Sequence, residues 1–190
     1  MIRSRLAGMI GVMAMCLACH AQEPAVREEP PNLHGSHELD PEGVTEKSVI
    51  RDYLESWKSL RNALDSNQAS LLSPDFAGTA QNKLADVIAQ QAKIGIHTRY
   101  VDRSHDLQII FYSPEGLSIE LTDNVVYDEQ VMQGGNILGT QTIRARYLAV
   151  LTPSDVRWTV RILQPEPESA NAGEETGIKG PGGGKPRVGP

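Results

Sequence analysis

The sequence predicts an α+β domain in which N-terminal helices pack on a curved, four-stranded antiparallel meander. Apolar residues recur at helical spacing between 45 and 94, whereas between 99 and 163 they alternate with a period of two. The extended runs are separated only by the short turn sequences SPEG, QGGN and TPSD, which favour antiparallel neighbours. Helices followed by strands, with one sheet face to cover, is the element order of an α+β domain.

Two long helices are expected in the first half of the domain. Thr45 is a suitable N-cap for the first helix and Thr79 for the second, and Gly95 follows the second helix where a C-terminal glycine is favoured. The apolar stripe of the first helix comprises Ile50, Tyr53, Leu54, Trp57, Leu60, Ala63 and Leu64, and that of the second comprises Ala80, Leu84, Val87, Ile88, Gln91 and Ile94.

Four strands are expected after Gly95, over residues 99–112, 117–131, 137–151 and 156–163. Because successive side chains of a strand point to opposite faces, every second residue of each strand should face the helices. The predicted domain therefore covers residues 44–164.

The first 21 residues have the layout of a secretory signal peptide. Arg3 and Arg5 precede an apolar run over residues 6–17, and Ala21 ends a cleavage site of small residues. We therefore expect export to the periplasm or the medium. Lipid attachment at Cys19 is the alternative, although the residue three positions before it is a cysteine where a lipobox favours an apolar side chain. Neither interpretation leaves a transmembrane segment in the exported protein.

Two stretches flank the predicted domain. Residues 22–43 are rich in Pro and Glu and are expected to form a flexible linker, and residues 165–190 are a Gly- and Pro-rich tail expected to be disordered. The net charge of −6 argues against a nucleic-acid partner. The domain contains two histidines and none of the common metal, phosphate or nucleophile motifs, so we expect no metal and no cofactor.

The element order, the helix YLESWKSLRNAL, the connection LLSPDFAG and the closing strand VRWTVRIL resemble the nuclear transport factor 2-like superfamily, which includes ketosteroid isomerase and SnoaL-like proteins. The resemblance covers residues 44–163. It implies a cone-shaped roll, in which a curved sheet wraps helices around an apolar pocket. It implies no particular activity, because this fold serves many functions.

Side-chain alternation identifies one candidate group for acid–base chemistry. His105 and Asp106 are adjacent, so on a regular strand they face opposite sides and cannot act together. His105 shares a face with apolar residues of its strand, and the SPEG turn places it opposite Asp123 or Val125. The QGGN turn places Tyr147, or the residue two before it, opposite Asp123.

His105, Asp123 and Tyr147 are therefore expected to converge on the concave face. Such a group could transfer a proton beside a carbonyl, with Asp123 or His105 as the base and Tyr147 as the donor to the developing oxyanion. A polar network that only stabilises the structure is the alternative, and we favour it because such networks are common in proteins without catalytic roles.

Two further sets of residues are candidates for binding. Tyr53 and Trp57, one helical turn apart, are expected in the core, where they could also form walls of a ligand pocket. Four arginines alternate with inward residues of the last two strands, and the TPSD turn places Arg146 near Arg161. These arginines form either a solvated face or a homodimer interface. These arginines are Arg144, Arg146, Arg157 and Arg161.

Taken together, these patterns favour an exported domain that binds a small apolar ligand or a protein partner in the bacterial cell envelope, without catalysis. One alternative is a small, cofactor-independent isomerase, dehydratase or cyclase that uses the acid–base group. Another is a homodimeric structural module in which side chains fill the cone.

Overall fold

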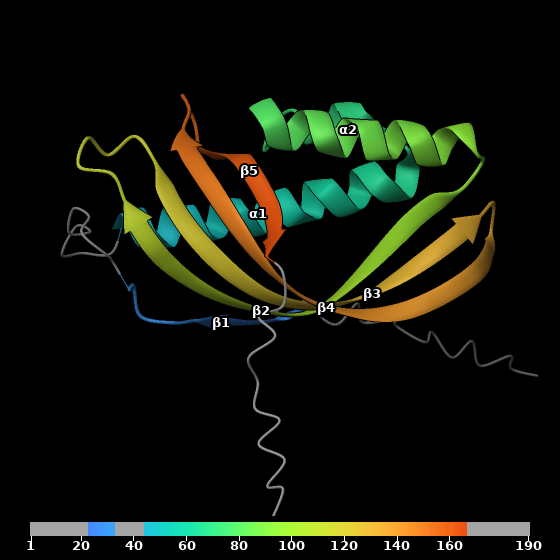
Figure 1. The fold of residues 1–190 in the computed structure, drawn as a ribbon, viewed down its shortest axis with the longest axis horizontal. Coiled ribbons are helices and arrows are strands. Elements are labelled where there is room, and N and C mark those ends of the chain that lie inside the picture. The colour runs from blue at the N-terminus through green and yellow to red at the C-terminus, as the bar shows by residue number, and fades with distance from the viewer. Residues whose placement is uncertain (1–22, 33–43, 167–190) are drawn as a thin grey trace, which may run out of the picture.

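The computed structural model describes residues 23–32 and 44–166 of the 190-residue chain. The predicted signal peptide with Cys19, residues 33–43 of the predicted linker and the predicted tail beyond residue 166 lie outside these ranges. The elements are, in chain order, β1 (Ala25–Glu28), α1 (Val44–Ser66), the 3-10 helix η1 (Ala69–Leu72), α2 (Gly78–Lys93), β2 (His97–Tyr112), β3 (Ile119–Gln133), β4 (Asn136–Pro153) and β5 (Trp158–Glu166) (Figure 1).

One five-stranded sheet, in the order β1-β2-β3-β4-β5, forms the base of the fold. The last four strands pair as antiparallel neighbours, and β1 pairs in parallel with the free edge of β2. The sheet thus has one strand more than predicted, and β1 comes from the segment interpreted as a flexible linker. All four residues of β1 are exposed, so it is backbone pairing with an open sheet edge that orders this polar segment.

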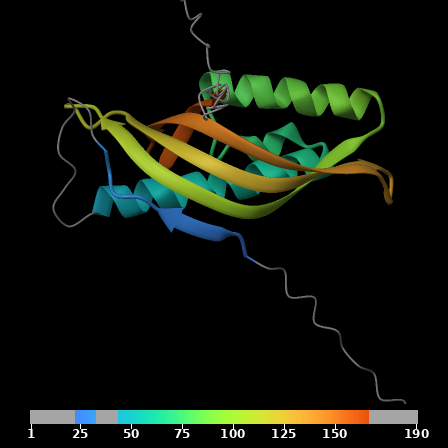
Figure 2. The ribbon, with the colours of Figure 1, turned by 60° about the horizontal axis from the view of Figure 1, so that its bottom comes forward.

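The sheet is strongly curved, and both long helices lie on its concave side (Figures 1 and 2). α1 packs against β2 and β5, and α2 packs against β5 and η1. Register shifts in β2, between Asp102 and Ser104 and between Ile109 and Phe111, mark β-bulges. Bulges bend a strand and increase its twist, which helps the sheet to wrap around α1.

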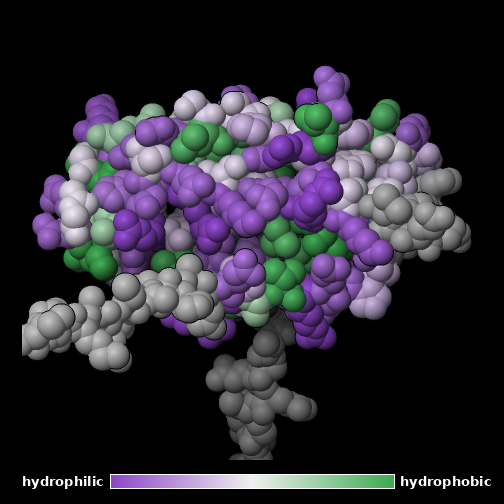
Figure 3. All heavy atoms as spheres, turned by 180° about the vertical axis from the view of Figure 1, so that it is seen from behind, coloured by the Kyte–Doolittle hydropathy of each residue, from purple (hydrophilic) through white to green (hydrophobic). Residues whose placement is uncertain are grey.

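The core lies between α1 and the concave face of the sheet. Most of the predicted stripe of α1 is buried there, and Leu54 packs partly buried beside it. Val87 of α2 and Ile94, which follows α2, are exposed, so the buried face of this helix is narrower than predicted. Seen from behind, the surface is mostly hydrophilic, with apolar side chains gathered in small areas (Figure 3). No helix in the described ranges is long and apolar enough to cross a membrane.

The helix ends differ from the predicted caps in two of three cases. α1 begins at Val44, so Thr45 lies inside the helix. The N-cap of α2 is Ala77, whose backbone N–H donates to the carbonyl oxygen of Val160 at 3.0 Å, so the chain is fixed there before Thr79 can act as a cap. Gly95 has a φ of +73° directly after α2, a conformation that costs glycine least.

Candidate functional site

Four buried polar side chains meet between α1 and the sheet. We call them the imidazole cluster: His105, Asp102, Asp123 and Tyr53. Nδ1 of His105 lies 2.7 Å from Oδ2 of Asp123, and its Nε2 lies 3.7 Å from Oδ2 of Asp102. The Tyr53 hydroxyl donates to the same Asp123 oxygen at 3.0 Å. The side chains of His105 and both aspartates are at most 2% exposed.

The strand register explains how His105 and Asp123 meet. Of the two registers that the sequence left open, the structure has His105 opposite Val125 on β3. Asp123 is therefore the next inward position along β3, a diagonal neighbour within reach of the imidazole. Asp106 belongs to the other face of β2 and pairs weakly with Arg27, at 3.9 Å.

Asp102 is the member of the cluster that sequence reasoning missed. It precedes His105 by three residues, a spacing that puts two side chains on opposite faces of a regular strand. The bulge between Asp102 and Ser104 inserts one residue and turns both side chains inward. Burial in the structure records this bulge, because the inward positions change from even-numbered residues such as Tyr100 to odd-numbered ones such as Leu107. The sequence gives no such signal, since the odd-numbered Val101 is apolar but exposed.

Tyr147 lies opposite Asp123 on β4, in one of the two registers that the sequence left open. The phenol that donates to Asp123, however, is that of Tyr53, which reaches down from α1. Tyr147 stands beside Asp123 in the sheet, where its ring packs edge-on against Trp57 with centroids 5.6 Å apart. The hydroxyl bonded to Asp123 is thus that of Tyr53, and the role of Tyr147 as donor to an oxyanion stays a prediction.

Electrostatics make the imidazole a cation at neutral pH. Burial opposes its protonation, but the hydrogen bonds and charges of Asp102 and Asp123 outweigh burial and raise the pKa of His105 to about 9. Nη1 of Arg61 lies 3.0 Å from Oδ2 of Asp102, so charges alternate from Arg61 inward to Asp123. Burial, and then the Asp123 charge, hold the pKa of Tyr53 well above its usual value, which keeps the hydroxyl protonated.

The two aromatic residues predicted as pocket walls lie in the packed core. Tyr53 is 0% and Trp57 is 2% exposed. The Trp57 ring packs against Tyr53, His105, Tyr127 and Tyr147, with centroid distances of 5.3 to 6.5 Å, so aromatic side chains fill this part of the core. Neither Tyr53 nor Trp57 lines any of the three pockets described below.

Unpaired polar atoms are concentrated around His105. In residues 23–32 and 44–166, four buried side-chain atoms lack a hydrogen-bond partner, and three of these belong to residues that contact His105: Oδ1 of Asp102, Oδ1 of Asp123 and Nε1 of Trp57. The Trp57 N–H moderates the rise in the pKa of Tyr53, but it meets no acceptor with hydrogen-bond geometry. A buried carboxylate oxygen without a donor is costly, so these two oxygens are the polar atoms of the cluster that lack a partner they need.

Two pockets of about 380 Å³ each are both lined by Arg61 and Asp102, which form an ion pair. The first, which we call the helix-side pocket, is lined by His105 and by residues of α1 that include Leu54 and Lys58. The second, the strand-side pocket, is lined by Tyr100, Val101, Arg103 and Asp128. Glu23, Arg61 and Asp102 line both pockets.

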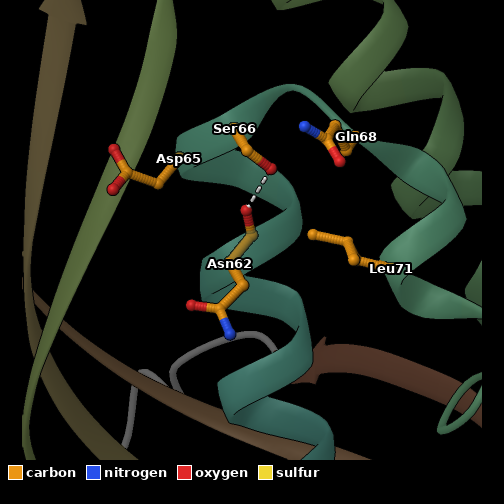
Figure 4. A pocket seen from close by; sticks show the side chains of 5 residues that line it. All are labelled: Asn62, Asp65, Ser66, Gln68 and Leu71. Atoms are coloured by element: carbon orange, nitrogen blue, oxygen red, sulfur yellow. Dashed lines mark hydrogen bonds between the residues drawn. The ribbon is translucent and has the colours of Figure 1, made fainter.

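A third pocket, of about 350 Å³, lies at the C-terminal end of α1 (Figure 4). Its lining is mostly exposed. Two of its polar side chains have partners: the Ser66 hydroxyl donates to the Asn62 carbonyl at 2.6 Å, and Asp65 pairs with Arg99 at 3.2 Å. It therefore offers a ligand no buried group that needs a partner. Among the described residues, no group of three or more His, Cys, Asp or Glu side chains could hold a metal ion.

The four arginines do not form the predicted array. Arg146 lies opposite Glu166 and pairs with it at 2.7 Å. The strands already pair at Pro153 and Trp158, so the turn lies later than TPSD and Arg161 falls at the level of Val150 and Leu151, away from Arg146. Arg157 pairs with the buried Asp75 at 2.5 Å and so does not belong to the outer face. Arg144 and Arg161 remain exposed.

No protein-family model and no curated protein matches the sequence. Among solved structures, the intermembrane space region of the chloroplast protein ARC6 aligns over 68% of this chain and 98% of its own, at 13% identity and a TM-score of 0.53. A putative scytalone dehydratase from Novosphingobium aromaticivorans aligns over 65% of this chain and 85% of its own, at 12% identity and a TM-score of 0.44. A hexachlorocyclohexane dehydrochlorinase, LinA-type3 from Novosphingobium barchaimii, aligns over 67% of this chain and 94% of its own, at 13% identity and a TM-score of 0.43.

At these identities, the likeness concerns the fold alone. The TM-scores of the scytalone dehydratase and the dehydrochlorinase lie below 0.5, so neither structure adds to this comparison.

Proposed function

We propose that this chain is an exported, non-catalytic binding domain whose ligand occupies the helix-side pocket and contacts Asp102. One observation carries the proposal: the Asp102 side chain is 2% exposed and has one unpaired oxygen, yet it lines both pockets. Its other oxygen already faces Arg61 and His105. Because a carboxylate only accepts hydrogen bonds, the free oxygen suits a ligand with an N–H or O–H group.

The remaining walls of the helix-side pocket describe the rest of the ligand. Leu54, Pro24 and Val26 provide an apolar surface, and Arg51 and Lys58 stand beside it. A pocket of about 380 Å³ falls within the size range of small-molecule sites. We therefore propose a small amphipathic ligand, with an alkyl or ring body and an amine, amide or hydroxyl at the end that reaches Asp102.

The environment of His105 supports binding rather than catalysis. To act as a general acid or base, His105 needs a ring nitrogen within hydrogen-bond reach of the substrate. Both ring nitrogens of His105 face carboxylates, the ring is packed against Trp57, and the side chain is 1% exposed. In this arrangement, the imidazolium holds Asp102 and Asp123 in place.

An acid–base enzyme is the second candidate, and the 2.7 Å contact between His105 and Asp123 favours it. In this alternative, Asp102 would be the group that touches the substrate, because it borders the pockets. Turnover of a bound compound by the wild type, lost in His105→Gln, would support the enzyme against the binding domain.

Export and self-association complete the proposal. The signal-peptide pattern of residues 1–21 supports export, with lipid attachment at Cys19 as its alternative form. A homodimer through the outer sheet face would now rest on the exposed Arg144 and Arg161 alone, since Arg146 and Arg157 have carboxylate partners.

The binding site is tested with octylamine, octanol and octanoate, which share one alkyl body and differ in the head group. By calorimetry, we expect octylamine to bind and octanoate not to bind. Asp102→Asn should weaken octylamine binding by about tenfold or more, since a hydrogen bond to a charged group is lost. Asp65→Asn, the same change at the edge of the third pocket, should leave binding unaltered.

Native mass spectrometry of the protein purified from its own source extends the test to the natural ligand. We expect a retained small molecule with an amine, amide or hydroxyl group. Equal binding of octylamine and octanoate, or equal binding by the wild type and Asp102→Asn, contradicts the proposed site.

A further inference from the structure

We propose that residues 23–29 form a releasable strap over the two pockets, so that local opening of β1 controls entry to Asp102. This proposal rests on the proposed function, because it assigns regulation to the same site. It follows from where the strap lies, from how weakly it is held, and from what remains when it leaves.

The strap forms one wall of both pockets. Glu23 lines each of them, and Pro24 and Val26 line the helix-side pocket opposite α1. In the parallel pairing of β1 with β2, Val26 lies directly opposite His105. The strap therefore runs alongside the bulged part of β2 that carries the imidazole cluster, and moving it would open the pockets on that side.

Few side-chain interactions hold the strap. All four residues of β1 are exposed, and none of them belongs to the hydrophobic core. Beyond the pairing of β1 itself, the Glu29 N–H donates to the Leu107 carbonyl at 2.7 Å. The ion pair of Arg27 with Asp106 is long, at 3.9 Å, and solvent screens it. Segments with few buried contacts open locally much more often than the core of the same protein.

The rest of the fold does not depend on the strap. β2 is paired with β3 along its whole length on its other edge, and the core cluster draws on α1, η1, α2 and the strands from β2 to β5. Release of β1 would expose an edge strand and the Arg61–Asp102 ion pair, while the core stayed packed. Opening is thus a local event and does not require unfolding.

A cysteine on the pocket wall reports opening without the use of a ligand. In the full chain with Cys16→Ser and Cys19→Ser, Leu54→Cys places a thiol in the helix-side pocket, and its alkylation by iodoacetamide is followed by mass spectrometry. Glu29→Pro removes the N–H that donates to Leu107, whereas Glu29→Ala removes only the side chain. We expect alkylation to be at least about fivefold faster with proline than with alanine.

Equal rates for the two variants, with unchanged circular dichroism, overturn the strap. If Glu29→Pro fails to fold, hydrogen exchange of the wild-type chain decides: we expect the amides of β1 to exchange much faster than those of β3, and equal protection overturns the proposal. The outcomes separate from the octylamine test. If proline speeds alkylation but octylamine does not bind, the proposed function is contradicted and the strap is not. If octylamine binds but the two alkylation rates are equal, only the strap is contradicted.

Discussion

Two buried polar clusters fasten α1 to the rest of the domain, and they differ in charge and in how completely they are hydrogen bonded. The imidazole cluster contains a cation and two carboxylates, and both carboxylates keep an unpaired oxygen. The second, which we call the amide cluster, consists of Gln91, Asn67 and Thr98 at the C-terminal end of α1. The Gln91 amide donates to the Leu64 carbonyl at 2.7 Å and to Oδ1 of Asn67 at 2.6 Å, and it accepts from Thr98 at 2.9 Å.

The difference separates a structural role from a candidate functional one. Every hydrogen-bonding group of the Gln91 amide is used, and no charge is buried, so this cluster has nothing left to offer a ligand. The imidazole cluster buries charge beside two pockets and leaves acceptors unpaired, which costs stability that an apolar core would have kept. Polar groups that lower stability in this way are concentrated at binding and catalytic sites.

The largest effect should come from breaking the buried charge pair. Asp123→Ala leaves the His105 cation with one carboxylate fewer in a site without solvent, and it leaves the Tyr53 hydroxyl without its acceptor. We expect the free energy of unfolding, measured by urea denaturation, to fall by about 3–5 kcal/mol. Asp65→Ala, which removes a carboxylate from exposed ion pairs, should cost less than about 1 kcal/mol. Similar losses of unfolding free energy in both variants would mean that the buried charges of the imidazole cluster stabilise the fold no more than an exposed ion pair does.

The charge of His105 should make stability depend on pH. Its folded-state pKa of about 9 lies above the ordinary value of 6.5, so the folded protein holds this proton more tightly than the unfolded chain does. The resulting stabilisation is fully present below pH 6.5 and is lost as the pH rises through 9, by about 3 kcal/mol in total. Urea denaturation between pH 6 and 9.5 measures the slope.

Two variants assign that slope to the cluster. His105→Gln should flatten it, because the titrating group is gone. Gln91→Leu should lower stability at every pH and keep the slope, because the amide cluster contains no group that titrates in this range. A slope that survives in His105→Gln contradicts a raised pKa at this residue.

Periodicity was sufficient to predict the order of the long helices and of the strands from β2 to β5. Pro and Glu content, by contrast, says little about whether a short segment pairs with an open edge, so β1 was interpreted as part of a linker. Its residues bury nothing, and the information that orders them lies in the edge of β2, far along the sequence. Single-strand patterns do not carry that information.

The candidate site was predicted where the strands are regular and missed where they are not. Alternation placed His105 and Asp123 on one face because no irregularity lies between their paired positions in β2 and β3. Asp102 was missed because the bulge before Ser104 changes which residues of β2 face inward. Tyr53 was predicted as a pocket wall, because the alternation of one strand does not show that a helix residue bonds to Asp123 on β3. Backbone bulges and contacts between helix and sheet are tertiary features that alternation cannot encode.

The smallest effect should come from the amide cluster, and it tests whether a satisfied neutral network behaves differently from a charged one. Gln91→Leu leaves the Leu64 carbonyl and the Thr98 hydroxyl without the partner they have now, for which we expect a loss of about 1–3 kcal/mol. Thr98→Val removes one hydrogen bond of the same network and should cost about 1 kcal/mol. If the network acts as a unit, the double variant will lose less than the sum of the two single losses, because both remove the same hydrogen bond. Additive losses would mean that Gln91 and Thr98 stabilise the fold independently, and full hydrogen bonding would then no longer distinguish this cluster from the one around His105.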